Sequence, residues 1–338
     1  MIHENVLIVC EEGKYAELYQ MMFSEILGDK VIFLDKVFQK KLTWFQKIIF
    51  ANKIYGITRF FLPYLYWRKF QIISWMEKLT QNRSEPVYLM FLSPSVQKYY
   101  TKEFLKRLKK QYKQVKIGLL FVDSAFVQQA SNALKLSLNE EIFDVVYSFD
   151  EKDAQNYGFT YADTPYSEYK GNKDLKEYDL YFCGSVKGRA ELLKEIHDRL
   201  KNKVTCVWDI FSNKSTKQKE IELIQTFTRC RESTEVLPYS EVLKKTMKAN
   251  CILDIVQKGQ KGKTVRYYEA ICNNKKLLTN NETVLTSKYY NPQYIQYFSK
   301  VEDINMEWIK EPCEVNFGYQ GEFSPENLIH RFVSECRS

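Results

Sequence analysis

The sequence predicts an α/β protein with two domains, each built on a doubly wound parallel sheet with helices on both faces. The chain has 338 residues, which is too long for one typical hydrophobic core. It holds only 12 glycines and 8 prolines, whereas an all-β fold needs a turn every ~8–12 residues. Short apolar runs also alternate with amphipathic stretches of helical period along both halves.

The first half predicts a series of strands separated by helices, and we assign residues 1–160 to the first domain. The amphipathic stretches predict helices from about Lys14 to Leu27 and over Thr101–Tyr112. Strands that are separated by helices pair in parallel, so their carboxyl ends meet at one edge of the sheet. The apolar runs predict these strands at Val6–Cys10, Val31–Leu34, Val87–Leu92, Ile117–Val122 and Phe143–Ser148.

A polar, turn-rich segment from Gly158 to Glu177 separates the two halves. Segments of this composition commonly connect domains. We therefore interpret 161–177 as a linker, 178–320 as the second domain, and 321–338 as a C-terminal helix that packs back towards the first domain.

The second domain is predicted to open with a strand, a glycine turn and a helix. We expect the strand at Tyr178–Cys183, a tight turn at Gly184-Ser185 and the helix at Arg189–Lys201. The next strand is expected at Val204–Trp208. The glycine turn therefore lies at a carboxyl end of the sheet, where open parallel sheets bind ligands.

A later unit of the same kind predicts an anion site. An apolar strand at Cys251–Val256 leads into a basic, glycine-containing loop, Gln257–Lys263, and then into a helix over Val265–Cys272. Thr264 is the expected N-cap, because a threonine hydroxyl can accept from the free N–H groups of the first helical turn. Those N–H groups and the helix dipole favour phosphate. An Asn273-Asn274 stop and a strand at Lys276–Thr279 are expected to follow.

Arg266 and Glu269 lie three residues apart in this helix and therefore share a face. A guanidinium there can grip a phosphate in bidentate fashion, and the carboxylate can accept hydrogen bonds from a sugar diol. The alternative is that the unit is an ordinary capped βαβ crossover with Glu269 on its surface. The sequence contains neither G-x-x-x-x-G-K-[ST] nor G-x-G-x-x-G, which argues against a P-loop ATPase and a standard dinucleotide dehydrogenase.

The composition favours a cytoplasmic protein with anionic partners. Lys and Arg exceed Asp and Glu by 50 to 42, a net charge of +8, but no nucleic-acid motif is present, so no nucleic-acid partner is expected. The eight cysteines are widely spaced without a C-x-x-C pair, which indicates free thiols in a reducing compartment. Neither a secretory signal nor a transmembrane run is evident in the sequence. The three histidines lack metal-ligand spacing.

The segment Trp44–Met76 is rich in aromatic residues with interspersed Lys and Arg. A basic aromatic helix can lie in an anionic membrane interface, with its rings at headgroup depth. Alternatively, these rings pack into the core of the first domain. The sequence leaves both interpretations open.

Four segments carry a resemblance to a known family: DVVYSFDEKDAQNYGFTYADTPYS, YFCGSVKGR, PYSEVLKKTMKANCILDI and the Gln257–Asn281 block. They resemble bacterial GT-B glycosyltransferases of capsule, exopolysaccharide and lipopolysaccharide synthesis. The resemblance implies two Rossmann-like domains that face a cleft, with the nucleotide-sugar bound by the second domain and a glycan or lipid-linked glycan acceptor bound by the first. The implied activity is metal-independent glycosyl transfer. The alternative is a non-catalytic nucleotide- or glycan-binding module of a polysaccharide assembly complex.

The resemblance also assigns donor-binding residues. Glu269 matches the glutamate that binds the donor ribose, and Thr264 and Arg266 match the helix start beside the diphosphate. The other donor-binding residues expected from the two loops are Gly184, Ser185, Arg189, Gln257 and Lys263. Retaining members of the family carry a second glutamate where this chain has Lys261, so the stereochemical outcome stays open. The sequence has no D-x-D triplet, and no metal or other cofactor is expected, because Arg, Lys and helix N-termini can neutralise the diphosphate.

Inverting transfer needs a carboxylate that deprotonates the acceptor hydroxyl. Three acids follow strands of the first domain and are the catalytic candidates: Glu11, Glu12 and Asp123. Asp123 is alternatively the cap of its turn, through Ser124. Asp254, inside a strand, is expected to be a buried and hydrogen-bonded structural acid.

Overall fold

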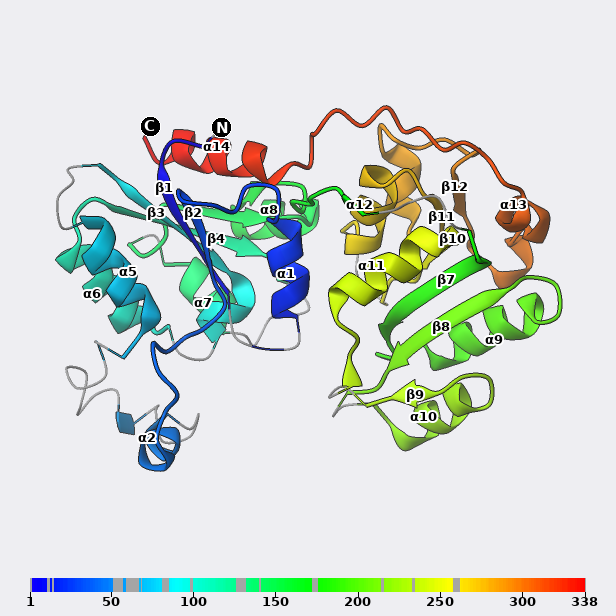
Figure 1. Cartoon of the computed structure of the whole chain (residues 1–338), viewed down its shortest axis with the longest axis horizontal. Coiled ribbons are helices and arrows are strands. Elements are labelled where there is room, and N and C mark those ends of the chain that lie inside the picture. The colour runs from blue at the N-terminus through cyan, green and yellow to red at the C-terminus, as the bar shows by residue number, and fades with distance from the viewer. Residues whose placement is uncertain are drawn as a thin grey trace. The chain divides into compact units, whose positions relative to one another are not determined.

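The computed structural model has two six-stranded sheets in which every strand pair is parallel. The chain divides into unit 1, Met1–Asp163 with Pro325–Ser338, and unit 2, Thr164–Ser324 (Figure 1). The predicted α/β class is confirmed. The structure describes residues 2–10, 13, 15–50, 57–58, 67, 69–80, 85–97, 100–125, 132–139, 141–171, 176–213, 216–232, 235–257 and 262–337.

The sheet of unit 1 has the strand order β2-β1-β3-β4-β5-β6. Its direction of winding reverses between β1 and β3, as in flavodoxin-like sheets. The strands are β1 (Asn5–Val9), β2 (Val31–Leu34), β3 (Val87–Leu92), β4 (Val115–Phe121), β5 (Val145–Ser148) and β6 (Thr160–Tyr161). The helices are α1 (Ala16–Met22), α2 (Trp44–Ile49), α5 (Gln71–Thr80), α6 (Lys102–Gln111), α7 (Asn132–Ser137), α8 (Glu151–Tyr157) and α14 (Pro325–Glu335), with a 3₁₀ turn η1 at Ser93–Gln97.

The apolar strands of unit 1 are buried because both faces of their sheet are covered. Every residue of β3 is buried, as expected for a central parallel strand. Leu89 and Phe91 belong to the core beneath α5 and α6, whereas Tyr88 on the opposite face packs edge-on against Phe332 of α14. The continuous apolar runs of the sequence therefore mark strands with two buried faces.

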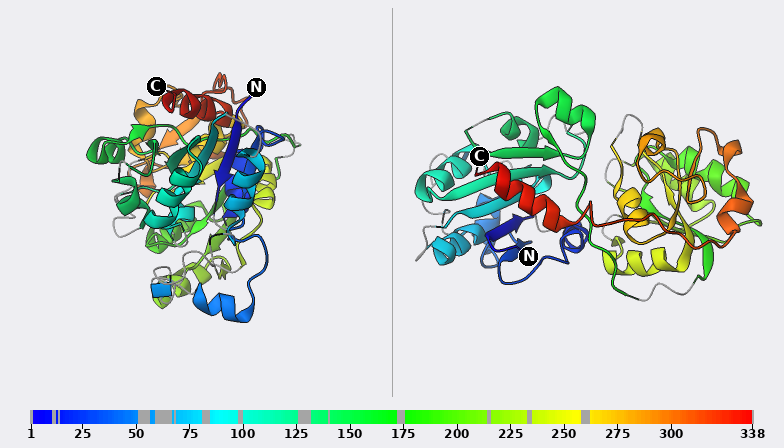
Figure 2. Two further views of the ribbon diagram at one scale, coloured as in Figure 1. Left: turned by 90° about the vertical axis from the view of Figure 1, so that its left-hand side faces the viewer. Right: turned by 90° about the horizontal axis from the view of Figure 1, so that it is seen from above.

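The C-terminal helix α14 is held against unit 1 by specific contacts (Figure 2). Phe332 is fully buried above Gly118 of β4. The Tyr147 hydroxyl donates to Glu335 at 2.6 Å, and Arg331 donates to the carbonyl of Tyr161 at 2.8 Å. A chain that has crossed into unit 2 thus returns to complete one face of unit 1.

The sheet of unit 2 has the order β12-β11-β10-β7-β8-β9, which in chain order is the Rossmann arrangement with its reversal between β7 and β10. The strands are β7 (Tyr178–Ser185), β8 (Cys206–Phe211), β9 (Cys230–Arg231), β10 (Ala249–Asp254), β11 (Lys276–Thr279) and β12 (Ile295–Tyr297). The helices are α9 (Ala190–Leu200), α10 (Gln218–Gln225), α11 (Tyr239–Lys248), α12 (Val265–Cys272) and α13 (Met306–Lys310), with 3₁₀ turns η3 (Glu282–Thr286) and η4 (Val301–Asp303).

Two local predictions need correction. Gly184 and Ser185 are not a turn but the last residues of β7, where they pair with Ile210 and Phe211 of β8. The turn follows at Lys187 and Gly188, whose φ angles are 41° and 77°. The first helix of the chain is also shorter than predicted, Ala16–Met22, because the Phe23 N–H donates three residues back, to Gln20, and the helix closes there.

The segment predicted to be a linker is largely built into the two units. Thr160 and Tyr161 form β6 at the edge of the first sheet. Tyr166 is buried in unit 2, where its N–H donates to the carbonyl of Phe323 at 2.8 Å. The chain therefore leaves unit 1 at Asp163 and returns to it at Pro325. Two Rossmann-like units of this kind form the GT-B architecture; that they face a cleft stays a prediction.

Gly118→Ala should destabilise the protein by about 1–3 kcal/mol, the usual cost of overpacking a core. A Cβ at this position would lie 2.6 Å from the Cε2 atom of the buried Phe332 ring. Urea unfolding measures the effect. Gly28→Ala is the matched control, because nothing lies within 4 Å of a Cβ there. Equal stability of the two variants would contradict the proposed role of Gly118 as the seat of α14.

Candidate functional site

The carboxyl ends of β7 and β10 in unit 2 form the candidate site. They lie where the strand order reverses, the position outside the strand ends at which open α/β sheets bind ligands. β7 ends at Ser185 and β10 at Asp254. Most of the residues predicted to bind a donor lie on these strand ends or on the segments that follow them.

Arg189 fastens the two strand ends together. Its guanidinium donates to the carbonyl of Ser185 at the end of β7 and to the carbonyl of Ile255 just beyond β10. Its Nε donates to Val186 at 3.3 Å. Among the described residues no carboxylate lies within ion-pair distance of it. The positive charge is thus fixed at the two strand ends without direct neutralisation.

Burial lowers the pKa of Arg189 to about 10, and the negative charge of Asp254 opposes this shift. The guanidinium remains charged at neutral pH because this pKa still lies well above 7. A partly desolvated cation of this kind attracts an anion more strongly than an exposed one, since the local dielectric is low. Arg189 is therefore the best-placed anion ligand among the predicted residues.

Gly184 provides the space that Arg189 occupies. A Cβ on Gly184 would lie 3.1 Å from the Phe182 ring and 3.2 Å from the Nη2 atom of Arg189. The guanidinium also lies over the Phe182 ring, 5.7 Å from its centroid, a favourable position for a cation. The glycine that suggested a turn in the sequence is instead a residue that lets a side chain cross the strand end.

The N-terminus of α12 is tied to the same strand ends. Thr264 caps the helix as predicted, because its hydroxyl oxygen accepts from the Arg266 N–H at 3.1 Å. The same hydroxyl donates to Asp254 at 2.9 Å, and Thr279 donates to the other oxygen of Asp254 at 3.1 Å. Burial raises the pKa of Asp254, and these two hydrogen bonds oppose that shift. The interpretation of Asp254 as a buried, hydrogen-bonded acid is confirmed.

The basic loop is anchored on both sides, although 258–261, and with it Lys261, lies outside the described residues. Before it, the Val256 N–H donates to the side chain of Asn280 at 2.9 Å. After it, the Asn281 amide donates to the carbonyl of Gly262 at 3.2 Å. Gln257 is half-buried at the start of the loop. Lys263 at its end lies over the Tyr267 ring, 5.6 Å from the centroid.

Glu269 does not lie on the surface, contrary to the alternative that the sequence left open. Its side chain is fully buried and forms an ion pair with Arg266. The hydroxyls of Tyr239 and Thr246 each donate to it at 2.6 Å. The Tyr239 hydroxyl in turn lies 3.0 Å from that of Tyr166.

The predicted contact of Glu269 with a sugar diol stays a prediction. Both of its oxygens accept hydrogen bonds from the protein, so a diol would reach it only if one of these partners moved. The burial of Glu269 follows from its position on α12, where it is flanked by the buried residues Tyr268 and Ala270. Burial opposes the charge of Arg266, but Glu269 raises the pKa of Arg266 well above its ordinary value. Glu269 thus holds Arg266 in place.

The catalytic candidates lie in unit 1. Asp123 is exposed just after β4. The neighbouring turn is held by Asp153, which accepts from the Ser124 hydroxyl at 2.9 Å and from the Ala125 N–H at 2.6 Å. Glu11 and Glu12 lie outside the described residues. Asp123 is thus placed at a carboxyl end of its sheet, as predicted for a base.

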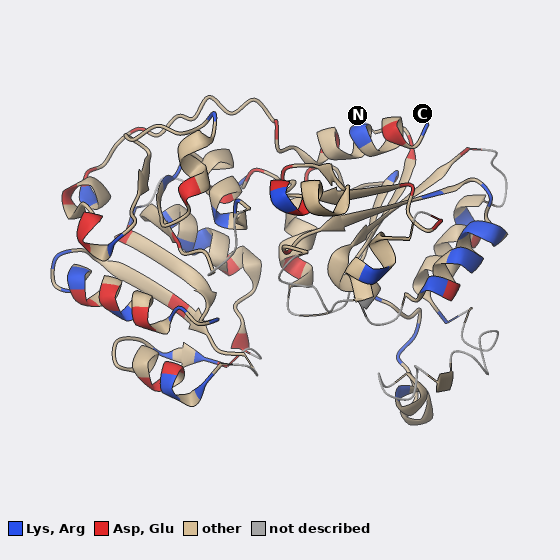
Figure 3. Ribbon diagram, turned by 180° about the vertical axis from the view of Figure 1, so that it is seen from behind, with Lys and Arg blue, Asp and Glu red and all other residues tan. Residues whose placement is uncertain are grey.

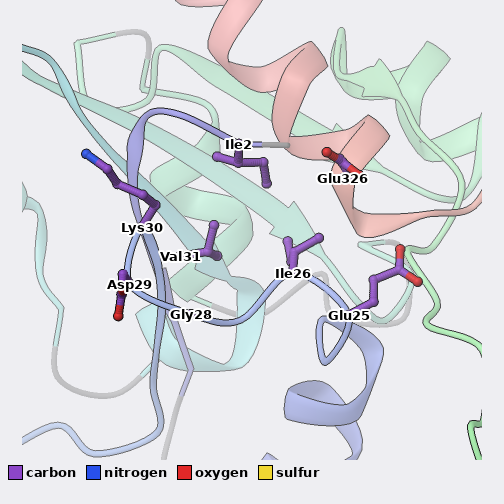
Figure 4. A pocket seen from close by; sticks show the side chains of 8 residues that line it. All are labelled: Ile2, Glu25, Ile26, Gly28, Asp29, Lys30, Val31 and Glu326. Atoms are coloured by element: carbon purple, nitrogen blue, oxygen red, sulfur yellow. The ribbon is translucent and has the colours of Figure 1, made fainter.

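A depression of about 460 Å³ also lies in unit 1 (Figure 4). Its lining includes Lys30 and Val31 at the beginning of β2, Ile26 after α1 and Glu326 of α14. These residues are at the amino ends of the strands, away from the edge at which open parallel sheets bind ligands.

Within the residues that the structure describes, no group of three or more His, Cys, Asp or Glu side chains could hold a metal ion. Nor does any helix there combine the length and apolar composition needed to cross a membrane. The eight cysteines are free thiols.

No protein-family model and no curated protein matches the chain. A glycosylation-associated protein complex (Gap123) from Streptococcus agalactiae is similar in structure, at 12% identity and a TM-score of 0.42, over 78% of this chain and 57% of that one. A GtfA/B complex is similar at 11% identity and a TM-score of 0.47, over 79% and 60%. A Phytolacca americana UGT2, complexed with UDP-2fluoro-glucose and pterostilbene, is similar at 10% identity and a TM-score of 0.42, over 100% and 94%.

This chain spans less than two thirds of the length of the first two of these proteins. At such identities and TM-scores the similarity assigns no activity to this chain. The strand orders of the two sheets, rather than these scores, establish the two Rossmann-like units.

Glu269→Ala should destabilise the protein by about 3–5 kcal/mol, because removal of one partner leaves the charge of Arg266 buried and unpaired. Tyr239→Phe, which removes one hydrogen bond to the carboxylate, should cost about 1–3 kcal/mol. Urea unfolding of each variant provides the measurement. Glu241→Ala is the control, because that glutamate pairs with Lys244 on the exposed side of α11. Wild-type stability of Glu269→Ala would contradict a structural role.

Proposed function

We propose that this protein is a glycosyltransferase that moves a sugar from a nucleotide-sugar donor to a surface polysaccharide or other glycan acceptor. The observation that supports it is Arg189, a partly buried guanidinium held by the carbonyls of both strands at the reversal point of a Rossmann-ordered sheet. Its charge has no direct carboxylate partner in the described part of the chain. A diphosphate bound at these strand ends would supply that partner.

The donor diphosphate is proposed to lie between Arg189 and the amino end of α12. The first N–H groups of that helix and its dipole favour negative charge. Ser185, Gln257 and Lys263 border this position on the strand end and the basic loop. Arg266 is a further candidate ligand on α12; its charge is paired with that of Glu269, which fixes the orientation of the guanidinium. Glu269 acts through Arg266 in this proposal.

The proposed chemistry uses fixed cations to stabilise the leaving nucleoside diphosphate. Negative charge grows on the diphosphate as the glycosidic bond of the donor breaks, and preorganised positive groups stabilise that charge. If the transfer inverts the anomeric centre, a carboxylate of unit 1 accepts the proton of the acceptor hydroxyl. Asp123 is the described candidate for this base, and Glu11 and Glu12 remain candidates from the sequence.

The proposal places the protein on the cytoplasmic side of the membrane, with a lipid-linked acceptor. The free state of all eight cysteines supports a reducing compartment. The non-catalytic alternative, a nucleotide- or glycan-binding module, is separated from the enzyme by turnover rather than by binding.

Arg189→Gln should weaken nucleotide-sugar binding by about 1–3 kcal/mol, through the loss of a charged hydrogen-bond donor to the diphosphate. A thermal-shift screen of UDP-, GDP- and CMP-sugars identifies the donor, and calorimetric titration measures its affinity. Arg199→Gln is the matched control, because that guanidinium also donates to two carbonyls, those of Glu302 and Ile304, near the other end of α9. Undiminished donor affinity of a folded Arg189→Gln protein would remove the basis of the proposal.

Turnover of the selected donor should release free nucleotide, and EDTA should leave the initial rate nearly unchanged. The reason is that arginine, lysine and helix N–H groups, rather than a divalent cation, neutralise the leaving group. The rate is measured with and without EDTA, and again after Mn²⁺ or Mg²⁺ is added back. A rate that collapses with EDTA and recovers with metal would refute the metal-free mechanism. Donor binding without turnover of any acceptor tried would favour the binding module.

A further inference from the structure

The entire net charge of the protein is contained in one segment of its sequence. Residues 36–76 hold eight Lys and Arg and no Asp or Glu. The remaining 42 Lys and Arg of the chain equal its 42 Asp and Glu in number. The net charge of +8 is thus the charge of a single stretch. A like-charged stretch of this length has a strong local attraction for an anionic surface.

Within this segment, α2 presents apolar side chains to solvent. Trp44 is 77% exposed, Phe45 64% and Ile48 37%. Ile57 is 64% exposed, and its neighbour Thr58 donates to the carbonyl of Ile49 at the end of α2. Exposing large apolar side chains to water in this way is energetically unfavourable. The clustering of Trp44, Phe45 and Ile48 on one short helix therefore indicates a surface that is covered in use.

The helix that carries them is well anchored. Thr43 and Gln46 form a capping box at its start, with the Thr43 N–H donating to the Gln46 side chain at 3.0 Å. At its other end Phe50 is buried, with its ring 4.6 Å from Phe38 and 6.2 Å from Phe70. The exposed rings are thus presented by a fixed element.

The aromatic stretch divides into residues that pack in the core and residues that do not. Phe50, Trp67 and Phe70 belong to the core of unit 1, whereas Trp44 and Phe45 are exposed. The parts of the stretch at 51–56, 59–66 and 68 lie outside the described residues. We call one exposed surface of this segment the α2 tip. It consists of Trp44, Phe45 and Ile48 with the exposed lysines Lys40, Lys41 and Lys47.

We propose that the α2 tip docks the protein on an anionic phospholipid bilayer. The lysines meet the headgroup phosphates, and the rings of Trp44 and Phe45 with the Ile48 side chain enter the interface below them. α2 carries Lys47 and no acidic residue, and Figure 3 shows blue but no red on this helix. This inference does not depend on glycosyl transfer.

Two other occupants fit the tip less well. A second copy of the chain would bring two strongly basic surfaces together, which is repulsive. The six residues of α2 span only about 9 Å, whereas a stable dimer buries about 800 Å² on each partner. Nucleic acid would satisfy the lysines and could stack bases on Trp44 and Phe45. The aliphatic side chains of Ile48 and Ile57 offer it no stacking surface, whereas a bilayer interior accommodates all four.

The α2 tip lies at the end of unit 1 where the carboxyl ends of its strands are. The segment that carries α2 follows β2, so it leaves the sheet from its carboxyl edge, and α2 lies at the opposite end of the unit from α14 (Figures 1 and 2). Asp123 follows β4 at the same edge. Docking through α2 would therefore bring the carboxyl edge of the first sheet towards the membrane.

The test is co-sedimentation of the whole protein with vesicles of phosphatidylglycerol and phosphatidylcholine in equal amounts. The wild-type protein should bind at low ionic strength and lose most of this binding at high ionic strength, because headgroup attraction is screened. Trp44→Ser with Phe45→Ser should weaken binding at least about tenfold. Lys40→Gln, Lys41→Gln and Lys47→Gln together should weaken it about a hundredfold at low ionic strength.

Matched controls separate the tip from general effects. Leu138→Ser replaces another exposed apolar residue of unit 1, and a triple Gln variant of Lys102, Lys110 and Lys113 removes the same charge from exposed positions on and beside α6. Both should bind as the wild type does. The proposal is overturned if the wild type ignores anionic vesicles, if the controls lose as much binding as the tip variants, or if a duplex oligonucleotide competes fully for the tip. A dimer that disappears with Trp44→Ser and Phe45→Ser would also overturn it.

Discussion

The hydrogen bonds from Arg189 to the carbonyls of Ser185 and Ile255 unite the features on which the candidate site depends. They join two strands that are neighbours in the sheet but far apart in the sequence, at the one place where the winding of the sheet reverses. They also hold a positive charge at the edge where open parallel sheets bind ligands. Gly184 is required for the same reason, since a side chain there would crowd the guanidinium.

The two arginines of the site differ in how their charges are compensated. Arg189 is satisfied by carbonyl oxygens, which leave its net charge in place, whereas Arg266 is neutralised by Glu269. A buried ion pair is tolerated when its remaining acceptors are hydrogen-bonded. Here the hydroxyls of Tyr239 and Thr246 donate to the Glu269 carboxylate. The pair therefore stabilises the shape of the site, and the carbonyl-bound arginine keeps the charge that a phosphate needs.

The two units divide the proposed tasks between them. Unit 2 carries the anion site on its Rossmann-ordered sheet, and unit 1 carries the exposed base candidate and the α2 tip. Helix α14 returns to unit 1, where Phe332 packs on Gly118. Unit 1 is therefore made of two segments of the chain that lie before and after unit 2 in the sequence. The two proposals thus involve anionic partners of two kinds: a small diphosphate at the partly buried Arg189 and an extended surface at exposed lysines.

The sequence by itself determined the fold class, the strands and the capped helix α12, because apolar runs, helical periodicity and a threonine N-cap are local signals. It also located Arg189 and Asp254 in the right segments. Only the tertiary structure decided that Gly184 ends a strand rather than forms a turn, since the pairing with Ile210 is not local. The tertiary structure also decided the burial of Glu269, whose partners Tyr239 and Thr246 come from another helix. It likewise separated Trp44 from Phe50. The two share one aromatic pattern but differ in burial, because only Phe50 contacts the distant Phe70.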